Sequence, residues 1–209
     1  MVRRIDHAIY AVRDLDASAR RLLDAHGLVS VPGGRHPRWG TANRIVPLGE
    51  TYVELLAVED PEVAPGLARA VLDATADGDR WYSICVADDD LEATATRLGL
   101  EVRPGARTRP DGAEVRWRGA GFDDPARPLW LPFFIAWDVP DQLLPGRADA
   151  PAHPSGASGI EAVEVGGDEA TLRAWLGEGD RLPIVLVDEE PGVRAVRFVT
   201  EHGDVFAVA

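Results

Sequence analysis

The sequence predicts an α+β protein built from three copies of one unit, in which a strand is followed by a helix and then by three further strands. Two observations support this fold class. The same order of apolar, amphipathic and strand-like runs recurs three times along the chain, and such self-similarity is typical of repeated structural units. In addition, PGGRH matches PGARTR 72 positions later, so that Pro32 aligns with Pro104 and Arg35 with Arg107. We therefore expect tandem βαβββ modules.

The first copy opens with the strand-like run RIDHAIYAV at 4–12. A helix is expected in DLDASARRLLDAHG, because its leucines and Ala19 recur on one helical face, while Asp14 can cap its start and Gly27 can end it. The polar stretch PGGRHPRWGTANR at 32–44 follows. Two further strands are expected near RIVPL and in TYVELLAV.

The second and third copies repeat this order less regularly. The second begins with RWYSICVA, continues with the helical run DDDLEATATRLG and a hairpin-like PDG turn, and ends in PLWLPFFIAWD. The third begins with GIEAVEVGG and has shorter inner strands. The stretch between them is rich in Pro, Gly, Ala and Ser, which is linker composition. We expect one domain at 1–138 made of two modules at about 1–58 and 80–138, a linker at 139–158, and a degenerate third module at 159–209.

Composition excludes several function classes. The net charge of -13 disfavours binding to nucleic acid or to an anionic membrane. The chain has no lysine, so lysine Schiff-base chemistry and a P-loop are excluded, and no glycine-rich motif indicates a nucleotide cofactor. No long apolar segment or signal peptide is seen. The single cysteine, Cys85, allows no intrachain disulfide, and a cytoplasmic location is expected.

Four segments of the first two copies resemble a known group of proteins. They are IDHAIYAVRDLDASARRL, PGGRHPRWGTANRIVPLGETYVELLAV, PGARTRPDGAEVRWRGAG and PFFIAWD. Through them, residues 4–138 resemble the vicinal oxygen chelate superfamily, which includes glyoxalase I, extradiol dioxygenases and the bleomycin-resistance proteins. Within it, the chain is most similar to the branch of glyoxalase-like domains. The resemblance implies curved mixed sheets that form a cup around a small molecule.

The resemblance also implies where a metal would bind. Members of the superfamily often hold a divalent metal such as Zn, Mn, Ni or Fe(II) with inward-facing side chains from the first and last strand of each module. In the first module these positions carry His7 and Glu54. Strand alternation places His7 on one face with Ile5 and Ile9, and Glu54 on one face with Tyr52.

The second module departs from this pattern. Ser83 stands where His7 is in the first module, and the second carboxylate position falls at or near Ala136. Serine is a poor ligand and alanine is none, so a complete four-ligand site is not expected from the two modules. His36 and His153 are the candidate further ligands, because both lie in polar, glycine-rich segments.

The polar stretch before the Glu54 strand is a candidate substrate site. The second copy repeats its prolines and glycines but has no counterpart of His36, Trp39 and Asn43. The repeated scaffold therefore does not explain these three side chains. Arginine binds carboxylates in a bidentate manner, which would suit an anionic ligand. The candidate substrate-binding residues are Arg35, His36, Trp39, Asn43, Arg44 and Trp137.

Two functions from different classes are open at this stage. In the first, His7 and Glu54 are the catalytic residues of a metal-dependent lyase, isomerase or dioxygenase, a reading that their retention favours. The alternative is a metal-free binding or sequestration protein of the bleomycin-resistance type, which the loss of ligands at Ser83 and Ala136 favours. An unpaired third module would expose a sheet face. Either the first two modules or a second chain would cover that face, and the latter case predicts a homodimer.

Overall fold

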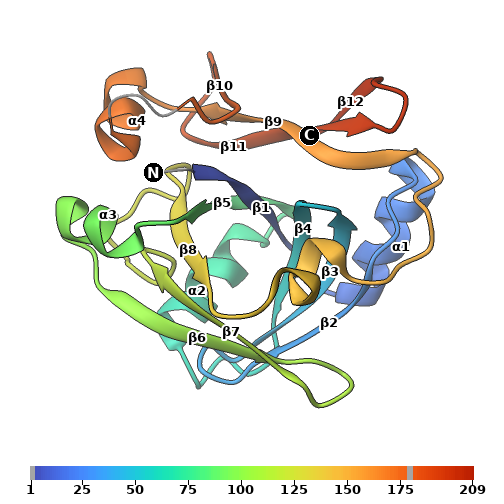
Figure 1. The fold of residues 1–209 in the computed structure, drawn as a ribbon, viewed down its shortest axis with the longest axis horizontal. Helices are drawn as coiled ribbons and strands as arrows, with labels where there is room; N and C mark the ends of the chain where they lie inside the picture. The colour runs from blue at the N-terminus through green and yellow to red at the C-terminus, as the bar shows by residue number, and fades with distance from the viewer. Residues whose placement is uncertain (1–2, 178–180) are drawn as a thin grey trace.

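In the computed structural model, which describes residues 3–177 and 181–209, the first two copies form a closed barrel and the third lies against its outer surface (Figure 1). The first copy has the expected order of elements. It consists of β1 (Arg3–Ala11), α1 (Leu15–His26), β2 (Val31–His36), β3 (Thr41–Leu48) and β4 (Thr51–Val58). Asp14 caps α1 by accepting a hydrogen bond from the backbone of Ala17, and Gly27 ends the helix with a φ of 61°.

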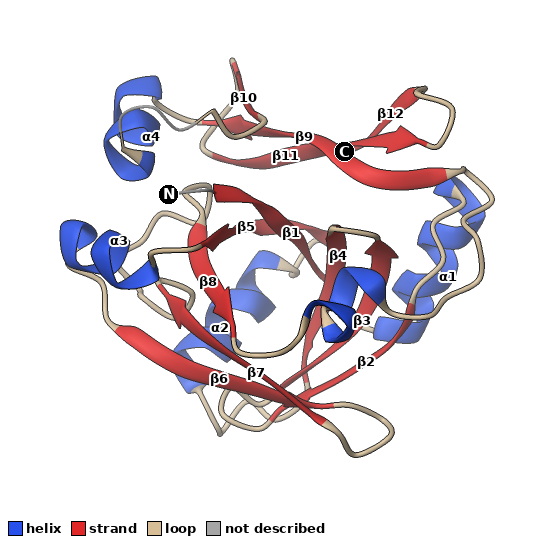
Figure 2. Cartoon of the chain, viewed as in Figure 1, coloured by secondary structure: helices blue, strands red, loops and turns tan. Residues whose placement is uncertain are grey.

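The second copy repeats the order after a connecting helix. That helix, α2 (Pro65–Ala74), closes one end of the barrel, because its Val71 packs in a cluster of inward-facing side chains with Ile9, Leu56 and Phe133. Helices α1 and α3 lie on the outside of the barrel strands (Figure 2). The second copy consists of β5 (Arg80–Asp88), α3 (Leu91–Leu98), β6 (Val102–Thr108), β7 (Glu114–Ala120) and β8 (Phe133–Trp137).

The barrel is closed by two seams between the copies. Its strand order is β1-β4-β3-β2-β6-β7-β8-β5, so β1 pairs with β5 and β2 pairs with β6. Within each of the first two copies the first and last strands are parallel neighbours, β1 with β4 and β5 with β8, while the other pairs of the barrel are antiparallel. The predicted α+β fold, with curved mixed sheets around a cup, is therefore confirmed.

The third copy forms its own four-stranded sheet with the order β10-β9-β11-β12. The segment before it carries two short 3₁₀ turns, at Asp141–Leu143 and Pro145–Arg147. No helix among the described residues has the length and apolar character needed to cross a membrane. The third copy consists of β9 (Ala157–Gly166), α4 (Glu169–Leu176), β10 (Ile184–Val187), β11 (Gly192–Thr200) and β12 (Val205–Val208).

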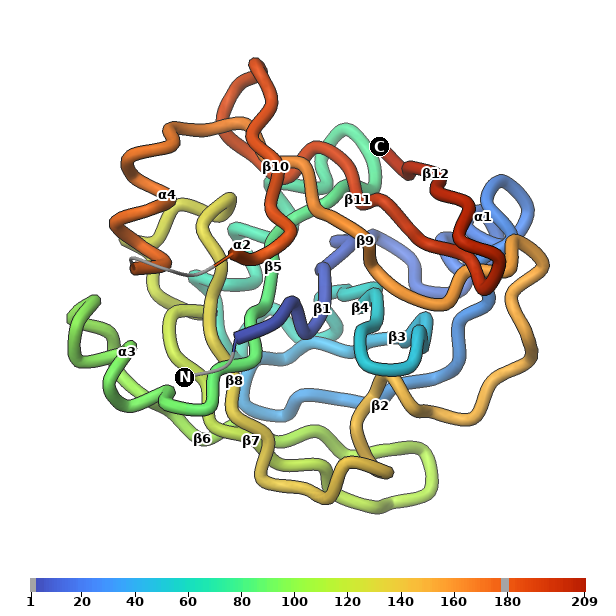
Figure 3. Tube along the Cα trace, turned by 45° about the horizontal axis from the view of Figure 1, so that its top comes forward, coloured from blue at the N-terminus to red at the C-terminus, as the bar shows by residue number. Residues whose placement is uncertain are grey.

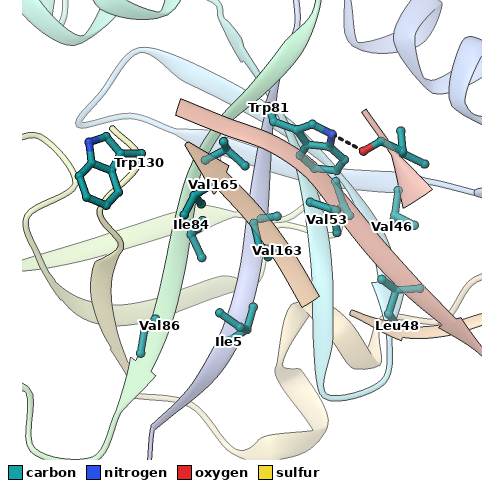
Figure 4. Close-up of a cluster of buried hydrophobic side chains, with 14 of the residues drawn as sticks. Ile5, Val46, Leu48, Val53, Trp81, Ile84, Val86, Trp130, Val163 and Val165 are labelled. Atoms are coloured by element: carbon teal, nitrogen blue, oxygen red, sulfur yellow. Dashed lines mark hydrogen bonds between the residues drawn. The ribbon is translucent and has the colours of Figure 1, made fainter. Parts of the chain in front are cut away.

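The main core lies between this sheet and the outer face of the barrel. Ile5 and Ile84 of the barrel pack in one buried cluster with Val163 and Val165 of β9 (Figure 4). The indole of Trp81 donates a hydrogen bond of 2.8 Å to a carbonyl of β12. A view turned by 45° shows the same sheet lying over β1 and β5 (Figure 3). The barrel of the same chain thus covers the third module, so this face gives no reason for a homodimer, and the oligomeric state stays a prediction.

A bulge in β1 changes which side chains share a face. The pairing of β1 with β5 shifts register between Ile5 and His7, which leaves Asp6 as an extra residue. Ile5 therefore packs in the outer core, while Ile9 belongs to the inner cluster and His7 lines the cup. The expectation that His7 shares a face with Ile5 is wrong for this reason.

Candidate active site

The interior of the barrel forms a cup with an empty volume of about 680 Å³, its open mouth included. One part of its lining is polar and comes from the first copy, where it includes His7, His36, Asn43 and Glu54. The rest is mostly aromatic and comes from both copies. The aromatic side chains are Trp39, Tyr52, Trp117, Phe122, Phe133 and Trp137.

Glu54 on β4 lies at the centre of the polar part. Its side chain is buried, and its Oε1 accepts a hydrogen bond of 2.6 Å from the amide of Asn43. His7 Nε2 lies 3.5 Å from Oε2, and His36 Nε2 lies 3.7 Å from Oε1. Burial alone would raise the pKa of the carboxyl, but the hydrogen bond from His7, the nearby His36 and the amide of Asn43 lower it to about 2. Glu54 is therefore an anion placed between two imidazoles.

His7 on β1 is held between two carboxylates. Its Nδ1 lies 2.7 Å from Oδ1 of Asp6, and its ring stacks on Tyr52 at 4.4 Å between centroids. Burial opposes charging of the ring, but the Cys85 sulfur, the hydrogen bond with Asp6 and the contact with Glu54 raise the pKa of His7 well above 6.5. His7 is thus the imidazole of the cup with the raised pKa, and the charged form of its ring is favoured.

The pKa of His36, at the end of β2, is shifted in the opposite direction to that of His7. Burial lowers the pKa of His36 to about 4, because the Glu54 carboxylate only partly offsets it and the charges on Arg107 and His7 add to it. His36 Nδ1 lies 3.0 Å from the Thr41 hydroxyl, and Nε2 lies 3.4 Å from the Asn43 amide nitrogen. We assign the neutral tautomer with its proton on Nδ1, since Nε2 then accepts from Asn43. The lone pair of Nε2 is thus held only by this long hydrogen bond from Asn43.

Comparisons with known proteins agree with this architecture. The family model described as "Glyoxalase-like domain" matches residues 5–179, which is most of the chain. The chain belongs to the glyoxalase-like domain family. No curated protein gives a significant match.

Solved structures show what the fold of this glyoxalase-like protein resembles. The crystal structure of a hypothetical protein from Staphylococcus aureus has a TM-score of 0.64 and 20% identity, covering 99% of this chain and 85% of that chain. A Streptomyces coelicolor methylmalonyl-CoA epimerase variant has a TM-score of 0.47 and 20% identity, covering 65% and 98%. The Mycobacterium tuberculosis methylmalonyl-CoA epimerase has a TM-score of 0.44 and 22% identity, covering 63% and 85%. At these identities the likeness concerns the fold alone.

The fold brings six of the predicted site residues of the glyoxalase-like protein to one cup. They come from β1, β2, β3, β4, β8 and the turn after β2. Trp137, in addition to lining the cup, donates a hydrogen bond of 2.8 Å from its indole to Oδ2 of Asp6. The six residues are His7, His36, Trp39, Asn43, Glu54 and Trp137.

Three other predicted site residues, Arg35, Arg44 and His153, lie outside the cup. Arg35 precedes the inward-facing His36 on β2 and is exposed, where it pairs with Glu59. Arg44 follows the inward-facing Asn43 and instead bonds to Ser30 and Asp16. Strand alternation explains both placements, because neighbours on a strand point to opposite faces.

His153 is used by the segment that links the modules. Its Nδ1 accepts a hydrogen bond of 2.9 Å from the backbone of Val29, and its Nε2 donates one of 2.8 Å to the carbonyl of Pro47. Both ring nitrogens are therefore occupied at a distance from Glu54, and the expectation that His153 supplies a metal ligand in the cup does not fit this placement.

The donor set of the cup does not fit a catalytic metal. Among the described residues, the group whose candidate ligand atoms all lie within 4.8 Å of one another is Asp6, His7 and Cys85. This buried trio is a possible metal site, although burial raises the pKa of the Cys85 thiol to about 12. Of this trio His7 lines the cup, whereas Asp6 and Cys85 do not. His7, Glu54 and His36 do not form such a group.

The sequence did not indicate several residues of the cup, and Arg107 is the buried charged one among them. Aligning it with Arg35 at an offset of 72 made it look like repeated scaffold, yet Arg35 is exposed and Arg107 is buried. The pairing of β2 shifts register between Pro32 and Gly34, and this bulge changes the phase of β2 relative to β6. Arg35 consequently lies opposite Thr108. The inward position on β6 is that of Arg107.

Proposed function

We propose that this glyoxalase-like protein is an enzyme of the isomerase or lyase class that moves a proton on a small molecule bound in the cup. The observation that carries the proposal is the opposite protonation tendency of His7 and His36 on either side of the Glu54 carboxylate. Neighbouring titratable groups whose environments push their pKa values apart are the usual arrangement of an acid and a base in one site.

The roles follow from these tendencies. His36, neutral at physiological pH, gives up the long hydrogen bond from Asn43, and its Nε2 accepts a proton from a carbon next to a carbonyl group of the ligand. The C–H electron pair moves into an enolate. His7, held charged by Asp6 and Glu54, stabilises the developing oxyanion through its positive charge. Return of the proton to carbon completes an isomerisation, whereas loss of a leaving group from the enolate completes an elimination. Glu54 acts through His7 by keeping it protonated.

Metal-free binding without turnover is the second candidate function. Ser83 on β5 is buried, and its hydroxyl donates to the carbonyl of Leu129 rather than facing the cup. Ala136 offers no polar atom on its side chain. The second copy therefore adds no counterpart of the first copy's His7 and Glu54 to the site, as would suit a sequestration protein. The dioxygenase alternative lacks support from the cup's donor set.

Solvent exchange distinguishes the two functions. Ketones, 3-oxo esters and 2-oxo acids would be incubated with the protein in D₂O and followed by ¹H NMR. The enzyme proposal predicts loss of the signal from the C–H next to the carbonyl in at least one compound that binds, at about 100 times the buffer rate or more. His36→Gln should abolish this exchange, while His202→Gln, a change in an exposed turn, should not. Ligands that bind without exchange would establish the sequestration alternative instead.

A further inference from the structure

The guanidinium of Arg107 is a buried charge that forms no ion pair within the described part of the chain. Arg107 lies on β6, is only 6% exposed and lines the cup. Its Nε and Nη1 are buried and have no hydrogen-bond acceptor among the described residues. A charge removed from water is costly unless it is paired and hydrogen-bonded, so this arrangement needs a compensating group.

Two other arginines show what paired guanidinium groups look like in this chain. Arg127 is 4% exposed, and its Nη2 also lacks an acceptor among the described residues, but its Nε donates to the carbonyl of Gly121 at 2.6 Å and its Nη1 to the Ser83 hydroxyl at 3.2 Å. Arg103 also lines the cup but is neutralised by Asp123 at 2.8 Å and Glu101 at 2.7 Å. Arg107 therefore differs from both an arginine that holds the fold together and an arginine in an ion pair.

Unpartnered donors of the cup outnumber unpartnered acceptors among the described residues, where the buried Oδ1 of Asn43 is the acceptor left without a hydrogen bond. The buried indole Nε1 of Trp39 has no acceptor among the described residues either. Gly33 leaves the space between Arg107 and Asn43, since a β-carbon there would lie 2.9 Å from Arg107 Nη1 and 2.1 Å from Asn43 Oδ1. An ionised carboxylate only accepts hydrogen bonds, and its two oxygens match the planar fork of arginine. The donors of this site fit such a group.

We infer that Arg107 recognises the carboxylate of the ligand, and that the ligand is a small carboxylic acid with an apolar or aromatic body. The indoles of Trp39 and Trp117, 6.0 Å apart between centroids, and the ring of Phe122 form the wall that takes this body. The inference rests on the proposed function only in that the ligand binds in this cup. It does not require turnover.

Binding of matched acid and amide probes tests the inference. Titration calorimetry would compare phenylacetate with phenylacetamide, which has the same body without the charge. The wild-type protein should bind the acid about 10 times more tightly or better, because the amide leaves the guanidinium unpaired. Inorganic phosphate should bind more weakly than phenylacetate, since it brings no apolar body. Equal binding of acid and amide, tighter binding of phosphate, or no binding of phenylacetate at millimolar concentration would each overturn the inference.

Variants assign the effect to Arg107. Arg107→Met keeps the length of the side chain without its charge and should remove the preference for the acid. Arg107→Lys keeps the charge without the fork and should give an intermediate preference. Arg116→Met is the matched control, and the preference should remain because Arg116 is exposed on the neighbouring strand β7, outside the cup, where it pairs with Glu114.

A measurement without ligand separates recognition from a structural role. Arg107→Met should raise the melting temperature of the free protein, since it removes an uncompensated buried charge, whereas loss of a structural arginine would lower it. Phenylacetate should raise the melting temperature of the wild type and not that of Arg107→Met. A less stable Arg107→Met variant would overturn the inference. Glu54→Gln should retain the preference for the acid even where exchange is lost, so a failure of the proposed chemistry is distinguishable from a failure of carboxylate recognition.

Discussion

The Glu54→Gln variant is expected to lose about 10²- to 10⁴-fold of the proton-exchange rate, which is the usual contribution of one acid–base group. Glutamine keeps the shape of the side chain, and its carbonyl oxygen can still accept the hydrogen bond from Asn43. It removes the negative charge that faces His7, so the pKa of His7 should fall and the charged acid should be depleted at neutral pH. The rate would be measured with a compound that exchanges in the wild type.

Glu59→Gln is the matched control for this variant. Glu59 follows β4, is exposed and pairs with Arg35 outside the cup. The same chemical change there should leave both the exchange rate and the His7 titration unaltered. Equal rates for Glu54→Gln and the wild type would rule out the role assigned to Glu54.

The Phe198→Ala variant is expected to lose about 3–5 kcal/mol of the free energy of unfolding, as large aromatic truncations in cores do. Phe198 on β11 is fully buried and stacks on Phe206 at 5.3 Å between centroids, in the same core as Ile5 and Ile84 of the barrel. Because this core joins the third module to the barrel, the whole chain should unfold in one step at a lower urea concentration. Tryptophan fluorescence and circular dichroism would follow the transition.

Val205→Ala is the control for the packing argument. Val205 lies on β12 of the same sheet but is 53% exposed, so its truncation should change stability by about 0.5 kcal/mol or less. A separate early transition in Phe198→Ala, with the barrel unfolding as in the wild type, would show that the third module is an independent unit.

Strand periodicity explains how much of the site could be predicted. A strand alternates its faces with a fixed period of two, so a short apolar run such as TYVELLAV is enough to place Glu54 on the same face as Tyr52. The structure indeed has both side chains in the cup. His36 and Asn43 also lie there. They could be predicted because the second copy has no counterpart of them, so the repeated scaffold does not explain them.

Bulges explain what could not be predicted. One extra residue in β1, at Asp6, moved Ile5 to the outer core. The register shift in β2 broke the correspondence between Arg35 and Arg107. A bulge depends on the pairing with a neighbouring strand, and this information is not local in the sequence. His153 could not be placed either, because the course of its segment is set by contacts with Val29 and Pro47, far away in the chain.

The pH dependence of the two histidines follows from their opposite shifts. The raised pKa of His7 gives stability that is fully present below pH 6.5 and is lost as the pH rises through the folded-state pKa. The lowered pKa of His36 acts in the other direction, because its neutral buried form stabilises the fold above pH 6.5 and this contribution is lost as the pH falls towards about 4. Proton transfer needs a neutral His36 and a charged His7, so activity should be confined to the pH interval between these two pKa values.

The most direct test of an acid and a base in one cup is an NMR titration of the imidazole rings in the wild-type protein. ¹⁵N chemical shifts of His7 and His36, assigned with His7→Gln and His36→Gln, report the protonation of each ring. We expect His7 to be charged and His36 to be neutral at pH 7, with His36 gaining its proton only near pH 4. Two rings that titrate together near pH 6.5, or a neutral His7 at pH 7, would contradict it.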